Sequence, residues 1–164
     1  RDNFTIIKTG LATAASEVTV LQANTAKLNA TNDFNGSDIT DANFSLNTEK
    51  YHNIGTVTTG MNISFLNGAY QSAAVNLAEG SSTINFALAD WPDRDHVAKI
   101  TVQLKGNDTA KTVTFTVDGG GTIKYDNNFP TPTTLDSSEN PLIIDFWTYN
   151  QGTTVYAEYR GQYT

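Results

Sequence analysis

Two runs between residues 97 and 117 alternate between apolar and polar side chains, which restricts this part of the chain to extended structure. The apolar positions are Ala98, Ile100, Val102 and Leu104 in the first run, and Val113, Phe115 and Val117 in the second. A period of two residues is that of a β-strand with one buried face. Gly106, Asn107 and Asp108 between the runs have the chemistry of a turn. We therefore predict a β-hairpin over 97–117 at the centre of the fold.

Shorter runs of the same kind predict further strands on both sides of this pair, at 54–58, 61–66, 69–77, 83–88, 122–125, 141–149 and 153–159. The segment 127–140 contains Pro130 and Pro132 among Asn, Thr and Ser, and is predicted to be a long loop. With 25 Thr and 17 Asn, the composition is typical of strands joined by turns. From residue 54 onward we predict an all-β sandwich of about eight strands and no helix, jelly-roll or immunoglobulin-like.

The first fifty residues have a different pattern, so we predict an N-terminal arm over 1–53 before a β-sandwich domain over 54–164. Within the arm, residues 13–29 predict a short helix that has Val18, Leu21 and Leu28 near one face. Ser16 is the expected cap of this helix. The rest of the arm is expected to be extended.

Three apolar residues, Phe34, Ile39 and Phe44, recur at five-residue intervals in an Asn-rich stretch of the arm. This spacing occurs in pentapeptide solenoids, but three repeats are too few to bury a core. We interpret them as apolar anchors that pack on the sandwich or on another subunit. Because an arm with so little apolar surface would hardly fold alone, we expect it to fix the protein in a larger assembly.

The charge and composition exclude several classes of function. A net charge of −7 argues against a nucleic-acid partner, which needs clustered basic residues. The chain has no cysteine, which excludes thiolate metal sites and thiol catalysis. No apolar run has the length of a transmembrane helix, and no signal-peptide pattern opens the chain, so membrane insertion is not expected. The run Asp118-Gly-Gly-Gly121 lacks the Gly-Lys-Ser/Thr of a phosphate loop and predicts a turn.

The densest charge lies in residues 90–96, Asp-Trp-Pro-Asp-Arg-Asp-His. Asp93 and Asp95 have the spacing of calcium ligands, but Arg94 separates them and no glycine follows. His96 has no nucleophile near it in sequence, and no motif places the second histidine, His52. We therefore interpret this segment as a strand corner whose tryptophan covers the end of the core. We predict no metal, no cofactor and no catalytic activity.

Three aromatic residues in the last predicted hairpin, Trp147, Tyr149 and Tyr156, are candidates for binding a surface ligand, because sugars stack on such rings. Aromatic residues in strands more often pack in a core or between subunits. A two-residue turn at Gln151-Gly152 sets Trp147 opposite Tyr156, whereas a three-residue loop sets it opposite Val155. The sequence leaves both registers open.

The order of motifs over 54–164 resembles a β-sandwich module of tailed-phage virion structural proteins. The resemblance rests on Gly68-Ala-Tyr-Gln71, Asp90-Trp-Pro92, Ile100–Leu104, Val113–Val117 and Leu142–Trp147 with a final strand at Val155–Tyr159. The Asn-rich stretch before the module is similar to connecting segments in marine and cyanobacterial phages. The sequence departs from this family at Ile123-Lys-Tyr125, where many members have a Trp-Pro-Gly-rich stretch.

This resemblance implies a non-enzymatic structural protein on the virion surface, a capsid decoration or a fibre component, made in the host cytoplasm. It also implies a homotrimer that contacts other virion proteins, without a cofactor, and that attaches to a host-surface glycan in some members. The alternative from the same strands and aromatics is a secreted carbohydrate-binding β-sandwich module.

Overall fold

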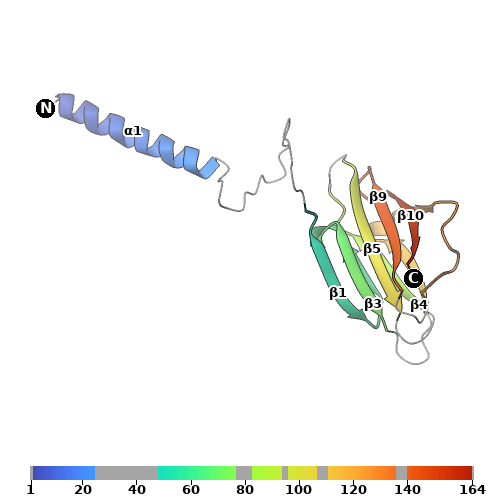
Figure 1. Ribbon diagram of the computed structural model, residues 1–164. Helices are drawn as coiled ribbons and strands as arrows, with labels where there is room; N and C mark the ends of the chain where they lie inside the picture. The colour runs from blue at the N-terminus through green and yellow to red at the C-terminus, as the bar shows by residue number, and fades with distance from the viewer. Residues whose placement is uncertain are drawn as a thin grey trace. The chain divides into compact units, whose positions relative to one another are not determined.

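The computed structural model describes residues 2–24, 48–76, 83–93, 96–106, 111–135 and 140–163. The chain divides into two units, Arg1–Ser45 and Leu46–Thr164, and each is considered by itself. The first unit contains helix α1, Asp2–Asn24 (Figure 1). The described part of the second unit forms ten strands and two short 3₁₀ turns, and it contains no α-helix.

The strands are β1 Tyr51–Val57, β2 Met61–Ser64, β3 Tyr70–Val75, β4 Thr83–Ala89, β5 Ala98–Gly106, β6 Lys111–Val117, β7 Thr122–Tyr125, β8 Thr133–Leu135, β9 Leu142–Thr148 and β10 Thr154–Gln162. The 3₁₀ turns are Phe65–Asn67 and Asp118–Gly120. The short strand β8 lies in the segment that the sequence predicted to be a loop.

Helix α1 begins at Asp2 rather than at residue 13, and Ser16 lies inside it instead of capping it. Both predictions were therefore wrong, and residues 25–29 lie outside the described residues. The apolar positions Phe4, Ile7 and Leu11 continue the helical spacing toward the N-terminus. Threonine hydroxyls within the helix donate to carbonyl oxygens four residues earlier, for example Thr9 Oγ1 to the Thr5 carbonyl at 3.0 Å.

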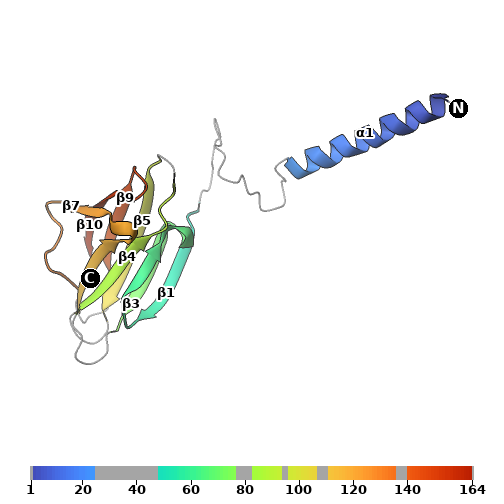
Figure 2. The ribbon, with the colours of Figure 1, turned by 180° about the vertical axis from the view of Figure 1, so that it is seen from behind.

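Two mixed sheets make up the second unit. One sheet has six strands in the order β1-β3-β5-β9-β10-β7, and the other has four in the order β2-β4-β6-β8 (Figures 1 and 2). From β1 to β9 the chain changes sheet at every connection, and among the described strands only β9 and β10 follow one another within a sheet. The strands β1-β3-β5 and β2-β4-β6 are parallel within their sheets, whereas β8 is antiparallel to β6 and β9 is antiparallel to β5.

The prediction of a mostly β, two-sheet domain is confirmed, but the predicted hairpin over 97–117 is wrong. Strand β5 pairs with β3 and β9, whereas β6 pairs with β4 and β8 in the other sheet. Both strands have the expected alternating burial. Two strands show the same alternation of buried and exposed residues whether they pair in a hairpin or lie in facing sheets. The pattern therefore predicted the two strands but not the strands that they pair with. The parallel pairs also differ from the mainly antiparallel sheets of immunoglobulin-like and jelly-roll sandwiches.

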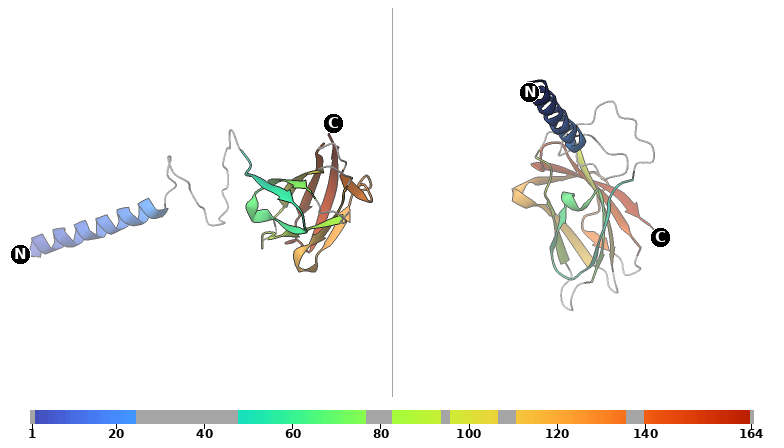
Figure 3. Two further views of the ribbon diagram at one scale, coloured as in Figure 1. Left: turned by 90° about the horizontal axis from the view of Figure 1, so that it is seen from below. Right: turned by 90° about the vertical axis from the view of Figure 1, so that its left-hand side faces the viewer.

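One hydrophobic core joins the two sheets, which lie as facing layers (Figure 3). Phe115 of β6 contacts Phe146 of β9 across the layers, with ring centroids 4.9 Å apart. Phe86 of β4 stacks on Phe115 within the smaller sheet at 6.1 Å. The side chains of Phe86 and Phe146 are fully buried. The large sheet therefore turns one face to the core and leaves its other face for contact outside the unit.

Candidate functional site

Three aromatic side chains gather on the outer face of the β9–β10 hairpin, and we call them the aromatic platform: Trp147, Tyr149 and Tyr156. The rings of Trp147 and Tyr156 stack with centroids 4.3 Å apart and an interplanar angle of 15°. Tyr149 lies 6.0 Å from Tyr156 and 6.4 Å from Trp147. The structure thus brings together all three residues that the sequence singled out as ligand candidates.

A tight turn sets the register that makes this stacking possible. Gln151 and Gly152 both have positive φ angles, 59° and 80°, and the Thr153 amide donates to the Asn150 carbonyl at 3.1 Å. These are the features of a type I′ hairpin turn. Trp147 therefore lies opposite Tyr156, as the two-residue-turn alternative required.

Thr148 holds the same turn together from inside the hairpin. Its buried hydroxyl donates to the Thr154 carbonyl at 2.8 Å and accepts from the Gly152 amide at 3.1 Å. Gly152 in turn packs on the ring of Trp91, since an added Cβ at this glycine would lie 2.4 Å from Trp91 Cδ1. The turn that aligns the platform is thus bonded on one side and packed on the other.

The platform faces away from the core but is only partly accessible. Trp147 and Tyr156 are half-buried, whereas Tyr149 is 50% exposed. The hydrogen bond between the hydroxyls of Tyr149 and Tyr156 raises the pKa of Tyr149, with the nearby Lys124 acting in the opposite direction. The Tyr149 hydroxyl therefore stays protonated near neutral pH, where it can donate to a polar ligand.

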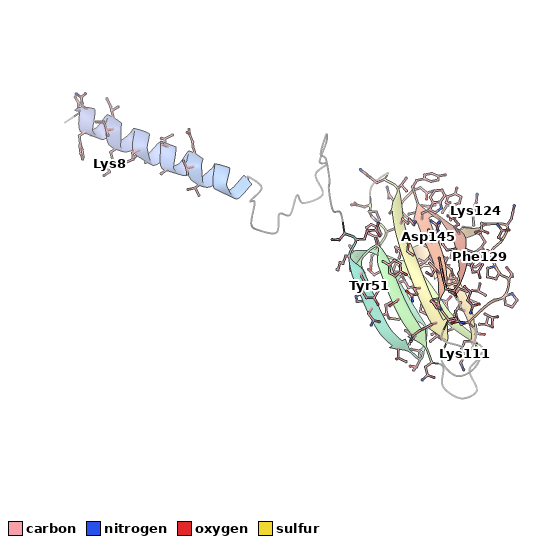
Figure 4. The ribbon with its side chains drawn as sticks, viewed as in Figure 1. Lys8, Tyr51, Lys111, Lys124, Phe129 and Asp145 are labelled. Atoms are coloured by element: carbon pink, nitrogen blue, oxygen red, sulfur yellow. The ribbon has the colours of Figure 1, made fainter. Side chains whose placement is uncertain are left out.

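A charged cluster lies next to the platform, around Asp145, which is two residues from Trp147 on β9 (Asp145 is labelled in Figure 4). Asp145 is 2% exposed, and it accepts hydrogen bonds from Thr101 Oγ1 at 2.7 Å and from Arg160 Nε. Lys99 Nζ forms an ion pair with the same carboxylate at 2.8 Å. Burial raises the pKa of Asp145, but the hydrogen bonds from Lys99, Thr101 and Arg160 outweigh it and the pKa is lowered.

Two lysines flank the aromatic rings along the rungs of the sheet. Lys99 of β5 is the register partner of Trp147, and Lys124 of β7 is that of Tyr156. A row across four strands thus reads lysine, tryptophan, tyrosine, lysine. Neither lysine was predicted to be a site residue from the sequence. The alternation of apolar and polar residues predicted that these lysines point away from the core. Their position beside the aromatic rings depends on the order of the strands in the sheet, which the sequence did not predict.

A polar hollow of about 400 Å³ lies farther along the large sheet, on β1, β3 and β5. Tyr51, Ser72 and Gln103 are among its lining residues. The Tyr51 hydroxyl lies 2.7 Å from Ser72 Oγ, and the ring of Tyr51 is 6.0 Å from that of Tyr70. Polar and aromatic side chains are therefore found at both ends of this face (Figure 4).

The segment 90–96 connects β4 in one sheet with β5 in the other, so the predicted strand corner is confirmed. Asp90 has a left-handed backbone with φ 56°, and Trp91 is half-buried against the core, 6.0 Å from the ring of Phe65. Arg94 and Asp95 lie outside the described residues. Within the described part of the chain, no group of three or more His, Cys, Asp or Glu side chains is placed to hold a metal ion.

The predicted anchors Phe34, Ile39 and Phe44 also lie outside the described residues, so their role stays a prediction. None of the described helices is both long and apolar enough to cross a membrane. Comparisons of the chain with protein-family models, with curated proteins and with solved structures found no match.

Proposed function

We propose that this chain is a non-enzymatic structural protein on the surface of a tailed-phage particle, and that its aromatic platform binds a glycan. The observation that carries the glycan proposal is the row of stacked rings on the outer face of the large sheet, with Trp147 and Tyr156 4.3 Å apart. The virion setting is supported by the motif order of residues 54–164 rather than by the site.

The chemistry of the platform suits a sugar ring. Aromatic faces offer broad apolar contact to the C–H groups of a sugar, and the tyrosine hydroxyls offer hydrogen bonds at the edge. Lys99 and Lys124 flank the rings along the same rung, which favours a glycan that carries carboxylate or sulfate groups. Because Trp147 and Tyr156 lie on paired strands rather than on a loop, these two rings gain little order on binding.

Tryptophan fluorescence tests the glycan proposal directly. The chain has two tryptophans, so Trp91→Phe leaves Trp147 as the reporter in the platform. We expect an acidic bacterial capsular polysaccharide to change this emission saturably, and neutral maltohexaose to act more weakly. Tyr156→Ala should weaken binding about 5- to 150-fold, if a sugar on this ring gains the roughly 1–3 kcal/mol that a base gains by stacking on an aromatic side chain.

Tyr51→Ala is the control for Tyr156→Ala. The ring of Tyr51 also lies next to another aromatic ring, 6.0 Å from that of Tyr70, but Tyr51 is on β1 with β3 and β5 between it and β9. Its replacement should leave the affinity unchanged. Equal losses for Tyr51→Ala and Tyr156→Ala, or no saturable change with a panel of acidic and neutral polysaccharides, would refute glycan binding at the platform.

The virion proposal includes a homotrimer and an arm that anchors it to other virion proteins through Phe34, Ile39 and Phe44. Peptides of this chain should be found by mass spectrometry in purified particles, and immunogold labelling should place them on the capsid or on a fibre. Phe34→Asp with Phe44→Asp should reduce incorporation into particles. Absence of the chain from purified particles would sink this part of the proposal.

A second candidate, a secreted carbohydrate-binding module, is favoured by the same aromatic platform. It predicts glycan binding by a protein that is not part of any particle, so particle composition separates the two. The finer fold class expected from the sequence, a jelly-roll or immunoglobulin-like sandwich, stays a prediction, and the parallel strand pairs weigh against it.

A further inference from the structure

Helix α1 carries a large apolar surface that is exposed to solvent. Its side chains from Asp2 to Thr19 are all exposed. The exposed fractions are 75% for Phe4, 68% for Ile7, 72% for Leu11 and 51% for Val18. A monomeric protein seldom exposes so many large apolar side chains on one helix, so we expect this helix to bind a partner.

The spacing of these residues indicates which kind of partner. Phe4, Ile7, Leu11, Ala14 and Val18 follow one another at alternating intervals of three and four residues. They occupy the a and d positions of two successive heptads and the start of a third. A period of 3.5 residues is that of a left-handed coiled coil, and the same seam must then be present on the facing helix. We call these five positions the α1 seam.

The composition of the helix indicates that it depends on such a partner. Gly10 and the β-branched residues Ile6, Ile7 and Thr9 lower its intrinsic helix propensity. A single helix of this length is marginal in water even with better helix formers. Lys8 is the only basic residue in Asp2–Asn24, whereas a helix that lies on a membrane surface is rich in Lys and Arg. These features favour a protein partner over a lipid surface.

The area of the α1 seam suits an interface between helices. Burying one of its four large side chains removes roughly 60–120 Å² of apolar surface from water, so two helices bury on the order of 480–960 Å². A stable interface buries about 1,200–2,000 Å² in total, of which about 57% is apolar, and the two ranges overlap. The buried area supports the seam, whereas the number of helices is taken from the proposed homotrimer.

We infer that helix α1 of three copies of this chain forms a parallel coiled coil along the α1 seam. The inference deepens the proposed homotrimer and rests on it for the number of copies, but not for the seam. In the parallel register, Lys8 at an e position faces Asn3 at a g position of a neighbouring copy, so no like charges meet there.

Two adjacent isoleucines provide a matched test in the full-length chain. Ile6 and Ile7 are both 68% exposed, but only Ile7 belongs to the α1 seam. By sedimentation equilibrium, the wild type should be a trimer, Ile6→Asp should remain one, and Ile7→Asp should dissociate at least tenfold more readily. Circular dichroism of the β-sheet signal checks that the second unit stays folded in both variants.

Cross-linking tests the parallel arrangement. Because the chain has no cysteine, a single Ile7→Cys substitution introduces the one thiol present. In a parallel seam, copies of position 7 lie within the distance that a disulfide needs, so mild oxidation should give covalent dimers. Ile6→Cys should give far fewer. Equal cross-linking of the two variants would overturn the seam.

The remaining outcomes are also decisive. A monomeric wild type at 100 µM would overturn the inference, whether the helix then packs on its own chain or binds vesicles. Dissociation by Ile6→Asp as well as Ile7→Asp would place the interface elsewhere on the helix. The fluorescence titration with polysaccharide reports on the aromatic platform alone. A trimer without glycan binding, or glycan binding by a monomer, would therefore show which of the two proposals had failed.

Discussion

Replacing Asp145 with Asn should destabilise the β-unit, because this carboxylate is buried and receives three donors. Asn has nearly the same volume, so the change removes the charge without creating a cavity. The amide can turn its oxygen toward Lys99 and Arg160 and its nitrogen toward the Thr101 hydroxyl, which is able to accept. The expected loss of stability therefore comes from the weaker hydrogen bonds of a neutral acceptor, and not from a donor that is left without a partner.

The magnitude follows from the exposure of the two cations. Hydrogen bonds to charged groups are worth about 1.5–3 kcal/mol and neutral ones about 0.5–1.5 kcal/mol, a difference of about 1 kcal/mol for each cation. The side chains of Lys99 and Arg160 are 48% and 47% exposed, so water replaces part of each interaction. We expect a total loss of about 1–2 kcal/mol, which lowers the melting temperature of a domain of this size by about 3–10 °C.

The pH dependence separates this account from a general effect on packing. Since the pKa of Asp145 is lowered in the folded protein, its contribution is fully present above the unfolded pKa of about 3.9. The contribution is lost as the pH falls through the lower, folded-state pKa. The difference in stability between wild type and Asp145→Asn should thus be constant from about pH 5.5 to 8 and should shrink below about pH 4.

Urea denaturation followed by circular dichroism at several pH values measures this difference. Glu158→Gln is the matched control, because Glu158 is the register partner of Asp145 on β10 but is exposed. Its effect should stay within about 0.5 kcal/mol. The reasoning fails if Asp145→Asn is as stable as the wild type at pH 7, or if the difference does not shrink in acid.

Two further predictions concern the turn and the strand corner. In thermal denaturation, Gly152→Ala should lower the free energy of unfolding by about 2 kcal/mol more than Gly119→Ala does. Both glycines have positive φ, but only a Cβ at Gly152 would meet the ring of Trp91. Equal losses of stability would contradict this contact. Calorimetric titration of calcium and zinc should give no saturable heat from the acids at 90–96, and a saturable signal lost on Asp93→Ala would refute our interpretation of this segment.

The sequence predicted most strands of the β-unit, because alternation reports directly on which side chains are buried. It predicted the pairing of β9 with β10 but not the partners of β5 and β6. Strands β5 and β6 have the alternation expected of a hairpin, yet they lie in different sheets and face each other across the core. The connection between them decides this, and its four residues, 107–110, are compatible in length with both arrangements. Strand β8 was missed because three residues are too few to show a period.

The candidate site was predicted in its aromatic residues but not in its charged ones. Trp147 and Tyr156 were set opposite one another only for a two-residue turn, and such a turn requires Gln151 to adopt a positive φ. Glutamine seldom does so, which is why the sequence left a three-residue loop open. The helix was placed too late in the chain because Gly10 and the threonines lower its propensity, whereas the heptad spacing of the α1 seam would have indicated it.

The route of the chain explains why the aromatic platform is well suited to hold a ligand. Strands β5 and β7 of the large sheet precede β9 and β10 in the chain. The hairpin of β9 and β10 lies between β5 on one side and β7 on the other. Strand β9 is paired with β5 from Thr148 to Leu142, and β10 is paired with β7 from Thr154 to Ala157. Trp147 and Tyr156 therefore project from the interior of a sheet, where neighbouring strands on both sides restrict their backbone. A binding surface held in this way loses little conformational entropy when a ligand stacks on it, so a modest area of contact can give measurable affinity.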